Sequence, residues 1–279
     1  MSGDFPYLPV SAKGWRLAMG LRPLEESKWL EVDGHRDEQL AQKHELLRDS
    51  RDVVVATRDE GLDASAELLE YVTAFLRDHH PGIALEVDPD EHPIVAAARL
   101  VQEDLCVMVK DDAWRLQAAC VCFPSRWRLV GKIGTTLDDI HTPIPNYHEE
   151  LSRPTNSFFD RLGPERSFWR LNWTVLDSPE LHQPIAARQS PKVDFDKWFF
   201  RVERQTLRQL ARTKGIVFTI HNYVESLATL IATNEEFAGN LLLALDTAPE
   251  AMNRYKGWVG LGDQLREVRS SRSSGARCE

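Results

Sequence analysis

The sequence predicts an α+β fold, with helices near both ends of the chain and a mostly antiparallel sheet between them. Apolar residues recur at helical spacing near both ends, whereas the middle of the chain alternates between apolar and polar residues, as half-buried strands do. Strands and helices do not alternate regularly along the chain, which disfavours a parallel, doubly wound sheet.

Helices are predicted first, after an entry segment that contains Pro and Trp residues. The predicted helices cover residues 37–47, 63–78 and 93–101. The clearest of them is 63–78, because its leucine, valine and phenylalanine residues recur on one helical face and Pro81 follows as a stop signal.

Strands are predicted for the middle of the chain. Residues 105–109 and 114–123 flank a Lys-Asp-Asp turn and indicate an antiparallel hairpin. Residues 168–175 alternate cleanly, with Trp169, Leu171, Trp173 and Val175 on one face and Arg170, Asn172 and Thr174 on the other. Further strands are expected at 198–203 and 216–223, separated by a helical segment at 204–212.

The C-terminal part returns to helix, at about residues 225–232 and 235–246. Asn234 is placed to cap the second of these helices, with two glutamates in its first turn. Pro249 is expected to open one more short helix.

The chain of 279 residues, 42% of them hydrophobic, is long enough for one large core. We expect a single domain over residues 1–268. From Arg269 the sequence is rich in Ser and Arg, which predicts a disordered tail over residues 269–279.

The net charge of −9 argues against a general nucleic-acid binder, because such proteins need a basic surface. No apolar run is long enough to span a bilayer, so no membrane association is expected. The first residues lack the basic and apolar regions of a secretory signal, and the expected location is the cytoplasm. The chain has 25 arginines and 9 lysines, and arginine suits the recognition of carboxylates.

Several familiar cofactor motifs do not occur in the sequence. It has no G-x-G-x-x-G, no Walker loop, no G-x-S-x-G and no H-E-x-x-H. It also has no C-x-x-C pair, and Cys106, Cys120 and Cys122 lie in apolar runs typical of buried thiols. Flavin, nicotinamide and iron–sulfur sites of the usual kind are therefore not predicted for this chain.

One histidine lies in an unusually stiff setting. Thr136 and Asp139 fit a capping box at the start of a short turn, and His141 falls near the end of that turn. Pro143 and Pro145 prevent the helix from continuing. An imidazole ligand, together with arginines upstream at Arg126 and Arg128 for two propionates, is what a b-type haem site needs. The spacing alone, however, favours a partly buried structural histidine.

An ordered set of motifs over roughly residues 5–245 resembles the haem-binding catalytic subunit of the haem-dependent oxidative N-demethylases. The motifs are Met19-Gly-Leu-Arg-Pro-Leu, Trp29-Leu-Glu, Phe123-Pro-Ser-Arg-Trp-Arg, Ile140-His-Thr-Pro-Ile-Pro, Phe158-Phe-Asp-Arg-Leu, Trp169-Arg-Leu-Asn-Trp, Arg201-Val-Glu-Arg-Gln-Thr-Leu, and Phe218-Thr-Ile followed by Tyr223. The resemblance implies a PAS-like antiparallel sheet with flanking N- and C-terminal helices that carries one haem b on a histidine.

The resemblance assigns the axial-ligand role to His141, with His221 as the second choice. Arg204 is a further candidate for a haem propionate, although an ion pair between Glu203 and Arg204 would explain both residues structurally. The resemblance also makes Arg170, Asn172 and Tyr223 candidates for the catalytic pocket. The alternatives are that the polar face of the strand is simply solvated and that the tyrosine is structural.

The activity implied is the removal of a methyl group from a small secondary amine with dioxygen, releasing formaldehyde. The electrons would come from a separate reductase subunit carrying flavin, an iron–sulfur cluster and NADPH. A haem-based PAS-like sensor is the first alternative, since fold does not fix function. A regulatory protein without haem is the second.

Overall fold

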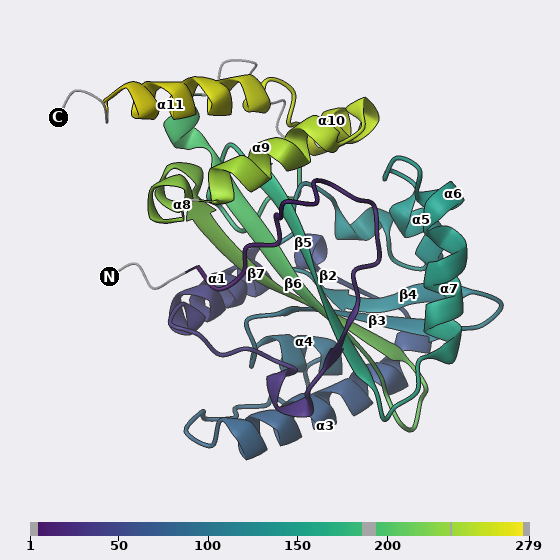
Figure 1. The fold of residues 1–279 in the computed structure, drawn as a ribbon. Coiled ribbons are helices and arrows are strands. Elements are labelled where there is room, and N and C mark those ends of the chain that lie inside the picture. The colour runs from purple at the N-terminus through teal and green to yellow at the C-terminus, as the bar shows by residue number, and fades with distance from the viewer. Residues whose placement is uncertain (1–4, 186–193, 235, 276–279) are drawn as a thin grey trace.

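A computed structural model describes residues 5–185, 194–234 and 236–275 (Figure 1). Within them, seven strands form one antiparallel sheet in the order β1-β5-β6-β7-β3-β4-β2. The strands are β1 (Arg22–Leu24), β2 (Val55–Thr57), β3 (Asp104–Lys110), β4 (Trp114–Cys120), β5 (Ser167–Leu176), β6 (Phe199–Gln209) and β7 (Ile216–Ser226). The predicted α+β class is confirmed.

Helices cover both faces and one end of this sheet (Figure 1). Those that precede the central strands are α1 (Arg36–Asp49), α2 (Arg51–Val54), α3 (Leu62–His79) and α4 (Pro93–Ala98). Those between β4 and β5 are α5 (Leu137–His141), α6 (Tyr147–Glu150) and α7 (Ser152–Arg161). Those that follow β7 are α8 (Leu227–Thr233), α9 (Phe237–Thr247), α10 (Glu250–Lys256) and α11 (Leu261–Gly275).

The five long strands have the PAS-like arrangement that the sequence analysis expects. They lie in the order β4-β3-β7-β6-β5, so the first hairpin sits beside the last strand. The connection from β4 to β5 crosses from one side of this group to the other and contains α5, α6 and α7. These helices therefore lie across one face of the sheet (Figure 1).

Register assigns each strand residue to one of two faces, because directly paired residues project to the same side. On one face Cys106, Met108 and Ile216 pack against Leu137 of α5 and Phe159 of α7. We call this the α5 face. It also carries polar side chains of β5 and β6, which are Arg170, Asn172, Thr174, Arg201, Glu203 and Gln205.

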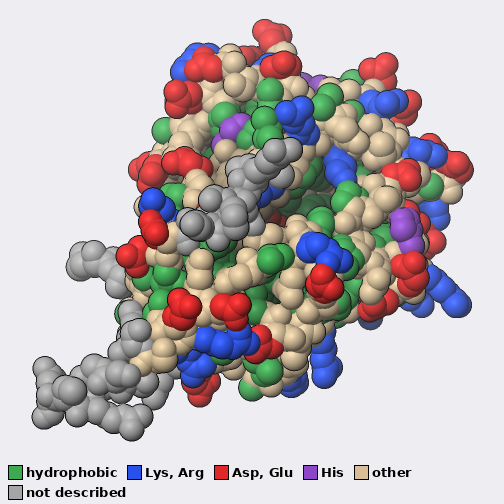
Figure 2. Space-filling model, turned by 90° about the horizontal axis from the view of Figure 1, so that it is seen from above, with side chains coloured by type: hydrophobic (Ala, Val, Ile, Leu, Met, Phe, Trp, Pro, Cys, Tyr) green, Lys and Arg blue, Asp and Glu red, His purple; other side chains and the backbone are tan. Residues whose placement is uncertain are grey.

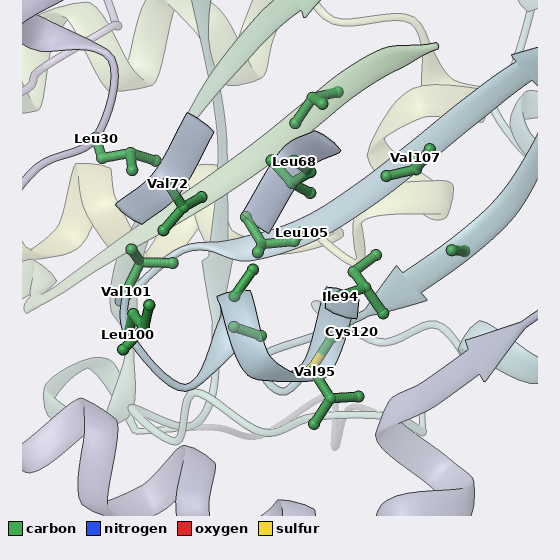
Figure 3. Close-up of a cluster of buried hydrophobic side chains, with 14 of the residues drawn as sticks. Leu30, Leu68, Val72, Ile94, Val95, Leu100, Val101, Leu105, Val107 and Cys120 are labelled. Atoms are coloured by element: carbon green, nitrogen blue, oxygen red, sulfur yellow. The ribbon is translucent and has the colours of Figure 1, made fainter. Parts of the chain in front are cut away.

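The opposite face, which we call the α3 face, packs against the N-terminal helices. Leu105 of β3 packs in one cluster with Leu68 of α3 and Ile94 of α4 (Figure 3). Val217 of β7 belongs to the same cluster. Helix α3 forms where predicted, because its apolar residues recur on the side that meets the sheet. The predicted split of residues 168–175 between two faces is confirmed by the pairing of β5 with β6.

The helix predicted for residues 204–212 is wrong, because β6 continues as a strand to Gln209. Its arginines and glutamine have good helix propensity, but full pairing with β5 and β7 on both sides prevails. Arg208, for example, stacks its guanidinium 4.2 Å from the ring centre of Trp29 and pairs with Glu26 at 2.8 Å.

The C-terminal helices form near the predicted positions and pack over the end of the sheet formed by β5 and β6. Asn234 accepts a hydrogen bond from the backbone N–H of Phe237 at 2.9 Å, and α10 follows Pro249 as expected. Helix α11 runs to Gly275, so residues 269–275, expected to be disordered, are helical, while residues 276–279 lie outside the described part. No described helix is long and apolar enough to cross a membrane.

A buried carboxylate ties α3 to the turn between β6 and β7. Glu67 is fully buried and accepts hydrogen bonds at 2.8 Å from the backbone N–H groups of Arg212 and Thr213 and from the Thr213 hydroxyl. Glu70, one turn later, instead makes an exposed ion pair with Arg212.

We expect Glu67→Ala to lower the free energy of unfolding by about 3 kcal/mol, because two buried backbone donors lose a charged acceptor. Glu70→Ala is the matched control and should cost less than about 1 kcal/mol, because its pair is exposed. Urea unfolding of the three proteins measures both values. Equal costs for the two variants would contradict this account of the turn.

Candidate functional site

The turn that carries His141 is held rigid by its own sequence. The Thr136 hydroxyl accepts a hydrogen bond from the Asp139 N–H at 3.1 Å, and the Asp139 carboxylate accepts one from the Thr136 N–H at 3.3 Å. The predicted capping box is thus confirmed. Leu137 is buried against the α5 face, which fixes the side of the turn that meets the sheet.

The His141 ring is oriented at both its edge and its face. Its Nδ1 lies 2.7 Å from the carbonyl oxygen of Leu137, and its ring stacks on Tyr147 with 4.7 Å between ring centres. The carbonyl can only accept, so Nδ1 carries the proton and Nε2 keeps its lone pair. No hydrogen bond joins Nε2 to a described residue.

The surroundings of His141 favour its neutral form. Burial lowers the pKa of the imidazole, the hydrogen bond to Leu137 raises it in part, and the positive charges of Arg170 and Lys132 lower it further. An oriented, neutral imidazole with a free Nε2 is the form in which histidine binds a metal.

Arg170 projects from β5 on the α5 face and is close enough to His141 for its charge to affect that ring. Its Nε is buried without a hydrogen-bond partner, and none of its nitrogens bonds to a described residue. Burial lowers the pKa of the guanidinium, and only the charge of Glu203 opposes this. A partly buried guanidinium with a sealed, unpartnered Nε is costly, so the arrangement is complementary to an anion.

Next to Arg170, Asn172 and Glu203 form a hydrogen-bonded pair across the sheet. The Asn172 amide donates to Glu203 Oε2 at 3.0 Å, and the Gln205 amide donates to the same oxygen at 2.8 Å. The Asn172 carbonyl oxygen lies 3.4 Å from the ammonium of Lys256. These residues come from β5, β6 and α10.

Lys256 closes the free edge of β5. It donates to the carbonyl oxygen of Trp173 at 3.2 Å, and two residues later Trp258 stacks on Trp173 with 4.6 Å between ring centres. Burial, opposed by the charge of Glu203 and reinforced by Arg170, lowers the pKa of Lys256 to about 8. Lys256 thus adds a second poorly solvated cation beside Arg170.

The surface has a hollow on the side that forms the top of Figure 1, and Figure 2 looks into it. Helices α5, α6 and α10 lie towards this side (Figure 1). Apolar side chains lie within it, and Lys and Arg side chains lie around its rim (Figure 2). The described residues contain no group of three or more His, Cys, Asp or Glu side chains that could hold a metal ion.

Two of the predicted site residues, Arg204 and Tyr223, lie on the α3 face instead. Arg204 pairs with Glu31, its Nε lying 3.0 Å from Oε1, and it also donates to the carbonyl oxygens of Lys28 and Trp29. The Tyr223 hydroxyl donates to the same carboxylate, as does that of Tyr7. The sheet therefore separates both residues from His141, and they do not share a pocket with it.

This position also corrects the expected ion pair between Glu203 and Arg204. Because the two are neighbours in a continuous strand, their side chains point to opposite faces. Glu203 meets Asn172 and Gln205, whereas Arg204 meets Glu31.

His221, the second choice for an axial ligand, has both ring nitrogens engaged. Nδ1 lies 3.2 Å from Glu103 and Nε2 lies 3.1 Å from Asp33. Burial opposes its charged form, but the hydrogen bonds to Asp33 and Glu103 outweigh burial and raise the pKa of His221 to about 9. A charged imidazole between two carboxylates offers no lone pair to iron.

Arg126 and Arg128, the two arginines predicted to bind haem propionates, lie on the loop after β4. Arg126 has a left-handed backbone (φ 63°), its N–H donates to the carbonyl oxygen of Gln183 at 2.6 Å, and its side chain pairs with Asp177. Arg128 is exposed. Of the residues predicted from sequence, the structure thus brings His141, Arg170 and Asn172 to one face of the sheet.

Residues 20–86 and 82–266 match the family described as haem-dependent oxidative N-demethylase, alpha subunit-like. The chain belongs to this family. The family name refers to a haem-dependent oxidoreductase. It also refers to the alpha subunit of an enzyme that has more than one subunit.

The sequence analysis did not predict Lys256 as a site residue. It also did not predict that Glu203 would be the partner of Asn172. Glu203 is the last residue of the strand predicted at 198–203, but only the register of β6 against β5 places it opposite Asn172. Lys256 follows the sheet by thirty residues on a separate helix, and nothing in its local sequence distinguishes it from a surface lysine.

We expect the stability that His221 provides to be lost at alkaline pH. Its pKa is about 9 in the fold, above the ordinary value of 6.5, so its contribution is complete below pH 6.5 and disappears as pH rises through about 9. Urea unfolding should show a stability gap between wild type and His221→Gln that shrinks by on the order of 3 kcal/mol across this range. A gap that does not change with pH would contradict the charged form.

Proposed function

We propose that this protein is a haem-dependent oxidase that demethylates a small secondary amine with dioxygen and releases formaldehyde. In this reaction one oxygen atom ends in formaldehyde and the other in water, and two electrons and two protons are consumed. The observation that carries the proposal is His141, an oriented imidazole whose Nε2 bonds to no described residue. The ring lies within reach of the charge of Arg170, whose Nε is buried without a partner in the described part of the chain.

The residues of the α5 face fit a haem. His141 would supply Nε2 as an iron ligand, and the hydrogen bond from its Nδ1 to the Leu137 carbonyl would hold the ring in place, as such bonds to metal-binding histidines do. Arg170 and Lys256 are poorly solvated cations that would find anionic partners in the two propionates. When bound, haem supplies the iron at which dioxygen is reduced.

The other residues of this face would position the substrate and exclude water. Apolar side chains such as Ile140 and Phe168 pack in the same cluster as Leu137 and Leu207. Asn172 keeps Glu203 in a fixed position between β5 and β6. Electrons would come from a separate reductase subunit carrying flavin, an iron–sulfur cluster and NADPH, in keeping with the family's description as an alpha subunit.

We expect protein produced with a haem supply to show a Soret band, and His141→Ala to lose or strongly shift it, because the variant removes the proposed axial ligand. His148→Ala is the matched control, since His148 lies in the neighbouring helix and is exposed. Circular dichroism establishes that both variants fold. A spectrum of His141→Ala identical to that of wild type would remove His141 from its role.

Turnover distinguishes the oxidase from a haem-based sensor. With a chemical reductant and oxygen, the haem-loaded protein should release formaldehyde from a secondary methylamine, and His141→Ala should release at least tenfold less, because it lacks the ligand that holds the iron. Formaldehyde is measured colorimetrically across a panel of methylated amines. A stable haem spectrum without formaldehyde from any amine would favour the sensor.

A further inference from the structure

Glu203 lies near the middle of β6 on the α5 face, the face that meets the His141 turn. It is only 8% exposed, and Asn172 of β5 and Asn222 of β7 are its direct neighbours in register. The side-chain amides of Asn172 and Gln205 both donate a hydrogen bond to the same oxygen of Glu203, Oε2. The carboxylate is therefore held in one orientation.

The second oxygen, Oε1, accepts no hydrogen bond from a described residue, and it is not among the fully sealed polar atoms. Because both donors bind Oε2, the other carboxylate oxygen, Oε1, remains able to accept a hydrogen bond. A carboxylate this deeply buried needs a further partner to offset its lost hydration.

Three cations lie around Glu203 in the described part of the chain. Arg170 and Lys256 lie within reach of its charge, as does Arg201, two residues before it on the same face. Two of the three guanidinium nitrogens of Arg201 are engaged elsewhere, since Nη1 donates to the carbonyl oxygen of Leu181 at 2.9 Å and Nη2 donates to that of Phe123 and to Asn222 at 2.8 Å. Its Nε is buried and bonds to no described residue. The cations offer hydrogen-bond donors only.

This arrangement is selective for a ligand that donates an N–H bond. An alkylammonium ion would be repelled by Arg170 and Lys256 at other positions on this face, and attracted at Oε1 alone. A small secondary amine presents an N–H in both its protonated and its neutral forms, so the same oxygen can hold either form.

We propose that Glu203 is the specificity-determining residue that recognises the amine, by accepting its N–H at Oε1, with Asn172 and Gln205 as positioning residues. This inference rests on the proposed function, because it assigns a substrate contact on the same α5 face. The alternative is a structural role, in which Glu203 serves only to balance the charge of Arg170 and does not contact the substrate.

The test measures substrate binding without turnover. Haem-loaded ferric protein, with no reductant present, is titrated calorimetrically with dimethylamine, the simplest secondary methylamine. Wild type is compared with Glu203→Gln, which keeps the shape but not the charge. The matched control is Glu225→Gln, because Glu225 lies on β7, faces the other side of the sheet and bonds only its neighbour's N–H in the described part of the chain.

We expect Glu203→Gln to weaken dimethylamine binding by about tenfold or more, because a charge-assisted hydrogen bond is lost, while the Soret band and melting temperature stay near those of wild type. Glu225→Gln should bind as wild type does.

Unchanged binding in Glu203→Gln would overturn the inference and leave the oxidase proposal standing. A loss of haem or of thermal stability with unchanged affinity in the remaining holoprotein would show the structural role and likewise overturn it. If wild-type holoprotein binds neither dimethylamine nor any other methylated amine, the inference and the proposed function fall together.

Discussion

Strand β6 places charged side chains on both faces of a sheet that is covered on both faces, and each of those charges needs a partner away from water. On the α3 face the chain itself supplies the partners. Glu26 and Glu31, from the segment before α1, meet Arg208 and Arg204. These ion pairs hold the N-terminal segment across the sheet, so the charges of Arg204 and Arg208 on the α3 face are balanced within the chain.

The α5 face does not balance its charges in the same way. Among the described residues, Arg170 has no hydrogen-bond partner and one oxygen of Glu203 has no donor, while Lys256 is poorly solvated. Such incomplete pairing costs stability in the protein alone, which is the usual mark of a site whose partners arrive with a ligand. The same strand thus builds a closed structural network on one side and an open polar surface on the other.

His221 and His141 show how environment divides one residue type into two roles. His221 lies between two carboxylates and is held as a cation, whereas His141 bonds a carbonyl oxygen and lies near two cations, which favours its neutral form. Both are aromatic neighbours of a tyrosine, His221 of Tyr223 and His141 of Tyr147. Only His141 keeps a nitrogen lone pair.

The sequence by itself determined the elements whose signals are local: the helical spacing of α3, the alternation of β5, and the capping box that leads to His141. It could not determine that β6 continues through Arg204, because residues with good helix propensity became a strand only when two neighbouring strands paired with them. That continuation decides on which face each charge lies. Tertiary structure therefore separated Arg204 and Tyr223 from His141 and brought Glu203 and Lys256 to the α5 face, since register and the return of α10 to the edge of β5 join residues far apart in the chain.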